Sequence, residues 1–233
     1  MKIILLPGLD GTGQLFQWLL PHLDGFDLQV ESLPQEGPQD YPHLTAVIAE
    51  RLPKDEPFVL LAESFSSPIA VQLAQQNSNI QAVIFVAGFL SKPRRLSLRL
   101  AKRYLGKKQL LRPWVKWLSA RWIFKKQASQ DVLAAFYDCL HQLDNKILRA
   151  RLTSISRLKP HPIKLHQPCL YLRPHMDVLV THNTLAEFVQ TCPKLQVMGF
   201  DAPHFLLQTQ SHSAAQRIRE FLHDKVSIAS STH

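Results

Sequence analysis

The sequence has little of what small extracellular or metal-dependent domains need. Only 3 of its 233 residues are cysteines, and they lie far apart without a Cys-x-x-Cys pair. That pattern argues against a disulfide framework and against a zinc site built on cysteine thiolates. No stretch approaches the ~18 consecutive apolar residues of a membrane-spanning helix. The opening apolar run, Ile3–Leu6, is shorter than the ~7–15-residue core of a signal peptide. We therefore expect a cytoplasmic protein.

Acidic side chains are scarce in one segment only. Residues 91–160 hold 18 Lys and Arg against 3 Asp and Glu, whereas the rest of the chain holds 9 against 15. The net charge of +9 therefore arises from one strongly basic segment within a mildly acidic protein. A local excess without a recognisable nucleic-acid-binding motif argues against a nucleic-acid partner.

Short apolar runs alternate with helical patterns along most of the chain. Six runs predict strands: Lys2–Leu6, Leu28–Ser32, Phe58–Ala62, Ala82–Val86, Cys169–Arg173 and Leu195–Gly199. Helical patterns fall near residues 14–22, 42–52, 66–76, 181–190 and 211–223. Apolar strands that alternate with helices are typical of a parallel sheet covered on both faces. The sequence therefore predicts an α/β fold with a doubly wound, mostly parallel sheet of six strands.

The alternation breaks between Gly88 and Lys159, where no strand is evident and several helices are expected. We interpret residues 89–159 as a basic, helical insertion after the fourth strand. Residues 1–88 and 160–225 then form the core of one α/β domain. The remaining residues, 226–233, are expected to form a flexible tail.

Ser64 lies where the apolar run Phe58–Ala62 changes directly into a helical pattern. The window Ala62-Glu63-Ser64-Phe65-Ser66 is similar to the G-x-S-x-G turn that presents a nucleophilic serine, with small residues in place of both glycines. The start of the helix also favours a developing negative charge there. Alternatively, Ser64, Ser66 or Ser67 only caps the helix. A hydroxyl attacks only when a base removes its proton, so the rest of the chain must supply one.

An acid and a histidine follow Ser64 at later strand ends. Asp177 comes shortly after the fifth predicted strand, and His204 lies between the sixth strand and the last helix. Because parallel strands end at the same edge of a sheet, we expect the three side chains to meet. Ser64 would attack an acyl carbon, His204 would take its proton, and Asp177 would orient the imidazole. His175 and Asp201 are the rival base and acid.

The loop after the first strand reads Pro7-Gly8-Leu9-Asp10-Gly11-Thr12-Gly13. Its glycines permit sharp backbone turns. We predict that the backbone N–H groups of Leu9 and Phe65 form an oxyanion hole. A phosphate-binding loop is the alternative, but the glycine spacing and the lack of a following Lys-Ser or Lys-Thr pair disagree with nucleotide-binding motifs. The chemistry requires no cofactor and no metal.

With these motifs the chain resembles the α/β-hydrolase superfamily over nearly its whole length. The LPGLDGTG loop together with AESFS resembles small bacterial hydrolases related to the phytyl ester synthase-like group. The outline is also similar to that of carrier-protein methyl ester esterases. The superfamily usually has His-Gly in this loop, where the present chain has Pro7-Gly8. The chain also begins at the family's third strand, so the resemblance implies a sheet without the first two family strands.

The resemblance gives the insertion the position of a cap over the active site. Its stretch QLLRPWVKWLSARWIFKK carries Trp114, Trp117 and Trp122 among basic residues. Bulky side chains at helical spacing predict a lid that lines an apolar acyl pocket. The basic residues suit docking at an anionic membrane surface, peripheral to the bilayer, or binding of an acidic acyl-carrier protein. Alternatively, the helix simply packs as a lid with its charges in solvent.

Three functions stay open from the sequence. The leading hypothesis is a serine carboxylic-ester hydrolase that acts on a small-molecule acyl ester. An acyl thioesterase or acyltransferase would use the same acyl-serine intermediate and differ only in the bond cleaved or the group that attacks next. A non-catalytic binding module would use the basic insertion and leave Ser64 idle.

Overall fold

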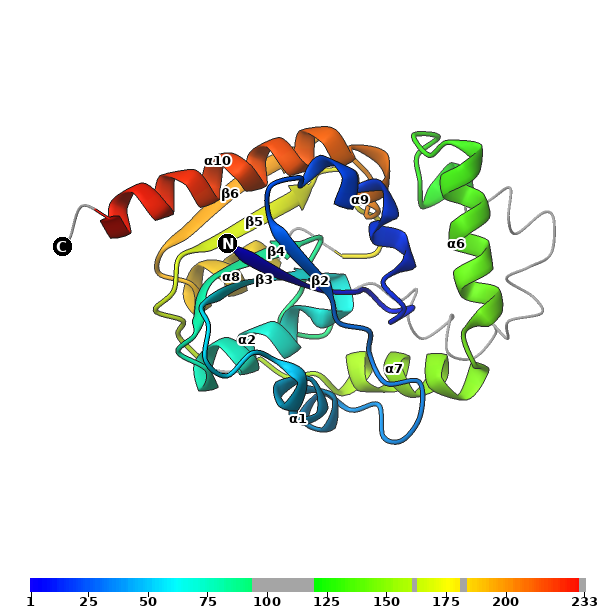
Figure 1. Cartoon of the computed structure of the whole chain (residues 1–233). Helices are drawn as coiled ribbons and strands as arrows, with labels where there is room; N and C mark the ends of the chain where they lie inside the picture. Colours follow the sequence, from blue (N-terminus) through cyan, green and yellow to red (C-terminus); the bar gives the residue numbers. More distant parts are fainter. Residues whose placement is uncertain (94–119, 161–162, 181–183, 231–233) are drawn as a thin grey trace.

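A parallel sheet of six strands forms the centre of the molecule (Figure 1). The computed structural model describes residues 1–93, 120–160, 163–180 and 184–230, with side chains through residue 224. The strands are β1 Lys2–Leu6, β2 Asp27–Val30, β3 Phe58–Glu63, β4 Ile80–Val86, β5 Cys169–Pro174 and β6 Leu195–Phe200. Their order in the sheet is β2-β1-β3-β4-β5-β6. All six predicted strands are confirmed to within two residues at each end.

The strand order places a switch point between β1 and β3. From β1 the chain moves outward to β2 and then returns to the other side of β1 to form β3. Loops that leave the carboxyl ends of β1 and β3 therefore diverge, and this is where open α/β sheets form ligand-binding crevices. The LPGLDGTG loop follows β1, and Ser64 follows β3.

Helices cover both faces of the sheet because successive strand residues point to opposite sides. Ile4 and Leu6 pack in the same core as α1 Tyr41–Arg51, α2 Ser67–Gln76 and α8 Thr184–Thr191. Ile3 and Leu5 point to the other face and pack in a second core. The helices that contribute to this core or pack against it are η1 Gln14–Trp18, η2 Leu20–His22, α9 Leu206–Thr209 and α10 Ser211–Ser230. Figure 1 shows α10 on one side of the sheet and α1 and α2 on the other.

The described residues between β4 and β5, where the sequence predicts an insertion, include two helices. They are α6 Gln130–Gln142 and α7 Asn145–Arg157. Ser129 and Asp144 cap them by accepting bonds from backbone N–H groups of the first turn. In Figure 1, α6 stands beyond the end of the sheet, and α7 runs beneath it. The apolar side of α7 packs in the same hydrophobic core as α1 and α2. The division of the chain into an α/β domain and a separate cap stays a prediction.

Two expected helices differ from the structure. The pattern near residues 14–22 forms two short 3₁₀ helices in place of one α-helix. Pro21 explains the break, because it lacks the N–H that an α-helix would need at that position. At the other end, the backbone of α10 continues to Ser230, past the expected end at residue 223. The flexible tail over 226–233 stays a prediction. Among the described residues, no helix combines the length and apolar character needed to cross a membrane.

Candidate active site

Ser64 occupies a strained turn between β3 and the helix that follows. Its φ of 48° lies in the left-handed region that residues with a side chain rarely adopt. The turn continues as the 3₁₀ helix η3, Ser64–Ser66, and then as α2. Neither η3 nor α2 begins with a side-chain cap bond, so the capping interpretation of these serines is not supported. The turn instead places Ser64 at the carboxyl end of β3.

Small residues flank Ser64 because the neighbouring backbone approaches closely. Ala62 is completely buried between β1 and β4. Ser66 is also buried, and its hydroxyl donates a 2.5 Å hydrogen bond to the carbonyl of Pro7. The residue that replaces the second glycine of the motif therefore links the serine turn to the loop after β1.

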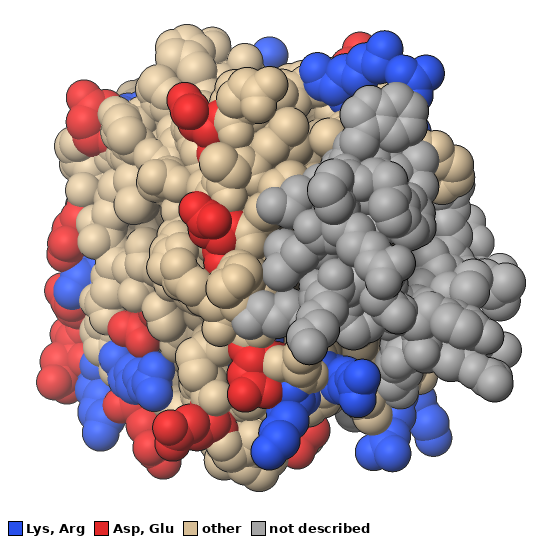
Figure 2. Space-filling view, turned by 90° about the vertical axis from the view of Figure 1, so that its right-hand side faces the viewer, with Lys and Arg blue, Asp and Glu red and all other residues tan. Residues whose placement is uncertain are grey.

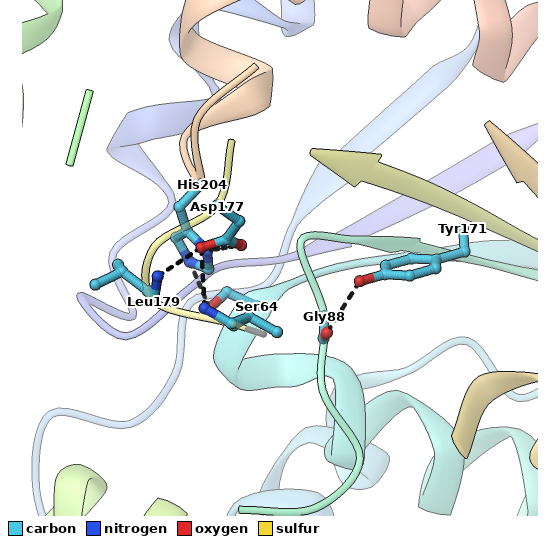
Figure 3. Close-up of polar contacts among 7 residues, drawn as sticks. Ser64, Gly88, Tyr171, Asp177, Leu179 and His204 are labelled. Atoms are coloured by element: carbon cyan, nitrogen blue, oxygen red, sulfur yellow. Dashed lines mark hydrogen bonds and ion pairs between the residues drawn. The ribbon is translucent and has the colours of Figure 1, made fainter. Parts of the chain in front are cut away.

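Ser64, His204 and Asp177 form a continuous chain of hydrogen bonds (Figure 3). The imidazole Nε2 lies 2.9 Å from the Ser64 hydroxyl oxygen, and Nδ1 lies 2.7 Å from Asp177 Oδ2. The other oxygen of Asp177 accepts the N–H groups of Leu179 and Val180 at 2.7 and 2.9 Å. The carboxylate is thus fixed on its own loop while it orients the imidazole.

The rival base His175 and the rival acid Asp201 contact each other and take no part in the hydrogen bonds that join Ser64, His204 and Asp177. His175 Nδ1 is 3.3 Å from Asp201 Oδ1, and the two side chains are 49% and 92% exposed. By contrast, the side chains of His204 and Asp177 are only 7% and 5% exposed. A solvated pair is a poor proton relay, and the described geometry joins neither rival to Ser64.

The charges around His204 raise its pKa. Burial by itself lowers the pKa, but the negative charge of Asp177, its hydrogen bond and the nearby Glu63 carboxyl outweigh that effect. The imidazole therefore holds a proton more strongly than it does in water. This property suits a group that must accept a proton from a hydroxyl.

Glu63 is a buried acid that the sequence analysis did not single out. Its carboxyl accepts a 3.0 Å hydrogen bond from Gln208 Nε2, which ties the serine turn to α9, just after His204. Burial raises the pKa of Glu63 to about 7, although the Gln208 bond opposes the shift. The sequence did offer one signal for Glu63, because it is an acid at the end of an otherwise apolar strand.

We expect Glu63→Gln to change how stability depends on pH. The pKa of Glu63 is about 7 in the fold against an ordinary value of 4.5. Between these values the folded state keeps a proton that the unfolded state releases. Stability therefore falls as pH rises from about 4.5 to 7, and an upward shift of this size corresponds to roughly 3 kcal/mol.

Urea unfolding from about pH 5 to pH 8 tests this expectation. The wild type should lose about 2 to 3 kcal/mol of unfolding free energy relative to Glu63→Gln over that range. Glu50→Gln, which changes an exposed acid on α1, serves as the control and should follow the wild type. Parallel curves for the wild type and Glu63→Gln would contradict the assignment of a raised pKa.

The loop after β1 turns sharply where the sequence predicts one of the two oxyanion-hole donors. Gly8 O accepts the Gly11 N–H at 3.1 Å and closes a turn in which Gly11 has a φ of 73°. In a trans peptide the C=O and N–H groups point in opposite directions. The Leu9 N–H, in the same peptide unit as Gly8 O, therefore points out of the turn. Phe65 N–H lies in the first turn of η3, where a helix leaves such groups without an internal partner.

The phosphate-loop alternative has little support at this position. A Cβ built on Gly8 would lie 3.7 Å from a Glu63 carboxyl oxygen and 3.8 Å from one of Asp10. A phosphate at this turn would therefore lie beside two carboxyl groups, and a negative charge on either of them would repel it.

The predicted tryptophans do not form a described pocket. Trp114 and Trp117 lie outside the described residues. Trp122 is 62% exposed, and Lys125 Nζ lies 5.9 Å from the centre of its ring. Its role in a lid stays a prediction.

A cluster of phenylalanines that the sequence analysis did not identify packs around Phe205, the neighbour of His204 in the sequence. The ring of Phe205 stacks on Phe124 at 4.6 Å and meets Phe136 edge-on at 5.0 Å. The His204 ring contacts Phe205 edge-on at 5.4 Å. Phe124 and Phe136 belong to the insertion, so aromatic packing joins the insertion to the loop that carries His204.

A six-strand parallel sheet with a strained serine at the end of β3 defines an α/β-hydrolase. Residues 35–205 match the family model described as "Serine aminopeptidase, S33". The match covers more than half of the chain, and the protein belongs to that family.

Solved structures share the fold across nearly the whole chain. An enol-lactonase from Burkholderia xenovorans has 16% identity and a TM-score of 0.79, covering 95% of this chain and 91% of its own. A lipase-esterase related protein from Clostridium acetobutylicum has 13% identity and a TM-score of 0.80, covering 94% and 93%. An esterase from Exiguobacterium antarcticum has 13% identity and a TM-score of 0.79, covering 96% and 92%. Among curated proteins, no match was found.

Proposed function

We propose that this protein is a serine carboxylic-ester hydrolase that forms an acyl-serine intermediate. The observation that carries the proposal is the hydrogen-bonded chain from Ser64 through His204 to Asp177, with distances of 2.9 and 2.7 Å. A buried imidazole between a hydroxyl and a carboxylate is the arrangement that activates a serine for attack. The printed names of the similar structures, an esterase and a lactonase among them, agree with ester chemistry.

The reaction would proceed in two halves. Ser64 Oγ attacks the acyl carbon while His204 Nε2 takes the hydroxyl proton, and the N–H groups of Leu9 and Phe65 bind the tetrahedral oxyanion. His204 then gives the proton to the alcohol oxygen as the carbon–oxygen bond breaks. In the second half His204 deprotonates a water molecule, which attacks the acyl carbon. The bond between the acyl carbon and Ser64 Oγ then breaks, His204 returns its proton to Oγ, and the carboxylic acid leaves.

An acyl series separates the possible substrates. Purified protein is incubated with p-nitrophenyl esters of increasing chain length, with matched thioesters and with aminoacyl p-nitroanilides. We expect the esters to be cleaved fastest, with a preference for apolar acyl chains because of the phenylalanines beside His204. Preferred thioesters would indicate a thioesterase, and preferred anilides would indicate an aminopeptidase. Added alcohol that captures the acyl group would indicate a transferase. Each of these three results would contradict the ester-hydrolase proposal.

We further propose that the basic segment brings the site to an anionic partner, either a membrane surface or an acidic carrier protein. The charge imbalance over 91–160 supports this proposal, as does the exposed Trp122 beside Lys125. On the face drawn in Figure 2, basic side chains lie at the upper right and along the lower edge, next to the residues in grey, and acidic ones are most frequent at the left. Sedimentation with anionic and neutral vesicles separates a membrane from a carrier.

A further inference from the structure

Arg151 is a completely buried cation from the insertion. It lies on α7 and is 0% exposed. Nη1 donates to the carbonyls of Leu9 and Asp10 at 2.9 Å each, Nη2 donates to Pro34 O at 2.8 Å, and Nε donates to Gln39 Oε1 at 2.9 Å. One side chain of the insertion thus holds the loop after β1 and the loop after β2.

None of these four acceptors is a carboxylate. Burial lowers the pKa of Arg151 to about 10, although the charge of Asp10 opposes the shift. The guanidinium therefore stays protonated at neutral pH. A buried charge without an ionic partner is costly, and carbonyl oxygens offset that cost only while they stay aimed at it. The position of the guanidinium and the conformation of the loop therefore depend on each other.

The loop is shaped around the guanidinium. A Cβ built on Gly11 would lie 2.3 Å from Arg151 Nη1, so the glycine leaves the space that the cation fills. Gly11 O in turn accepts the Leu33 N–H at 2.8 Å, which ties this turn to the chain after β2.

Arg151 also contacts the other predicted oxyanion donor. Its guanidinium carbon lies 6.0 Å from the centre of the Phe65 ring, a distance typical of a cation–π contact. The same ring stacks with Tyr41 at 5.0 Å. Arg151 therefore touches both residues whose N–H groups are predicted to bind the oxyanion, Leu9 through its carbonyl and Phe65 through its ring.

We propose that Arg151 is a positioning residue that holds the Leu9 and Phe65 N–H groups in the geometry that binds the oxyanion. The proposal rests on the proposed ester-hydrolase function. A helix of the insertion would then support the loop after β1. That loop has Pro7-Gly8 and therefore no histidine at this point, and two of its carbonyls accept bonds from Arg151. Arg151 itself touches no reacting atom.

Three variants test the proposal: Arg151→Met, Arg151→Lys, and the control Arg149→Met, which removes an exposed arginine from the same helix. Active sites are counted with a fluorophosphonate, and kcat and KM are measured with p-nitrophenyl butyrate. The inhibition constant of an alkyl trifluoromethyl ketone is measured in parallel. Ser64 would add to the ketone carbonyl and form an anionic adduct, so its affinity reports on the oxyanion hole separately from substrate binding.

We expect Arg151→Met to lower kcat by about 100-fold and to raise the inhibition constant by a similar factor, with little change in KM. Arg151→Lys keeps the charge but lacks the planar fork that reaches both carbonyls, so its values should fall between those of Met and wild type. Arg149→Met should match the wild type. A merely structural role would reduce the number of active sites and leave both constants unchanged.

Two results would overturn the inference. One is a folded Arg151→Met, or Arg151→Lys if the Met variant does not fold, with kcat and inhibition constant close to those of an active wild type. The other is a reduced kcat with unchanged affinity for the ketone. A wild type that neither cleaves the ester nor binds the ketone would instead refute the proposed function, and the inference with it.

Discussion

Replacement of Ser64 by alanine is expected to reduce kcat/KM for the best p-nitrophenyl ester by about 10⁴- to 10⁶-fold. The Ser64 hydroxyl is the group hydrogen-bonded to His204 Nε2, and alanine offers no atom to attack the acyl carbon. Steady-state hydrolysis, with the folded fraction checked by thermal unfolding, measures the effect. The fold should persist, because alanine removes one atom.

Ser67→Ala is the matched control for this variant. Ser67 is buried three residues further along the same segment, and its hydroxyl has no hydrogen-bond partner among the described residues. Its removal should leave turnover unchanged. Comparable turnover by Ser64→Ala and the wild type would end the proposal that Ser64 is the nucleophile.

Asp177→Asn should lower kcat by about 10⁴-fold, as expected when the orienting acid of a serine triad is replaced. Asp177 Oδ1 accepts the N–H groups of Leu179 and Val180, so the asparagine oxygen takes that place and the amide nitrogen turns toward His204 Nδ1. Nδ1 must then accept a bond, and the ring proton moves to Nε2. In that tautomer the imidazole cannot take the proton of Ser64.

The pH dependence of activity gives an independent measurement of the same residue. Protonated His204 is inactive as a base, and Asp177 raises its pKa above the ordinary value of 6.5. Activity of the wild type should therefore decline as pH falls, with a midpoint above 6.5. In Asp177→Asn the residual activity should decline at a lower pH. Asp201→Asn, at the exposed rival acid, should leave rate and midpoint unchanged. A midpoint that does not move in Asp177→Asn would contradict the pairing with His204.

Much of the fold could be predicted, because local apolar runs mark the strands and parallel strands end at the same edge of a sheet. Apolar runs identified all six strands. The four central strands, β1, β3, β4 and β5, are largely buried on both faces and therefore need no polar alternation. The order of Ser64, Asp177 and His204 along the chain predicted their meeting, because all three follow parallel strands. Their catalytic roles remain the proposal that the experiments test.

The remaining features depend on tertiary packing that no local pattern encodes. Arg151 is one of 18 basic residues in its segment, and nothing in the sequence separates the buried one from those in solvent. Burial in the folded core raises the pKa of Glu63, and the Gln208 side chain that bonds its carboxyl comes from α9, far along the sequence. The sequence predicted tryptophans around the acyl pocket. In the structure the ring that contacts His204 is Phe205, which packs with Phe124 and Phe136 from two other segments.

The most direct test of the acyl-serine mechanism is mass spectrometry of the protein quenched during turnover of a p-nitrophenyl ester. We predict that the wild type carries one acyl group, on the peptide that contains Ser64, and that His204→Gln carries none. An acyl group on a different peptide, or equal acylation of Ser64 without the His204 imidazole, would contradict the account.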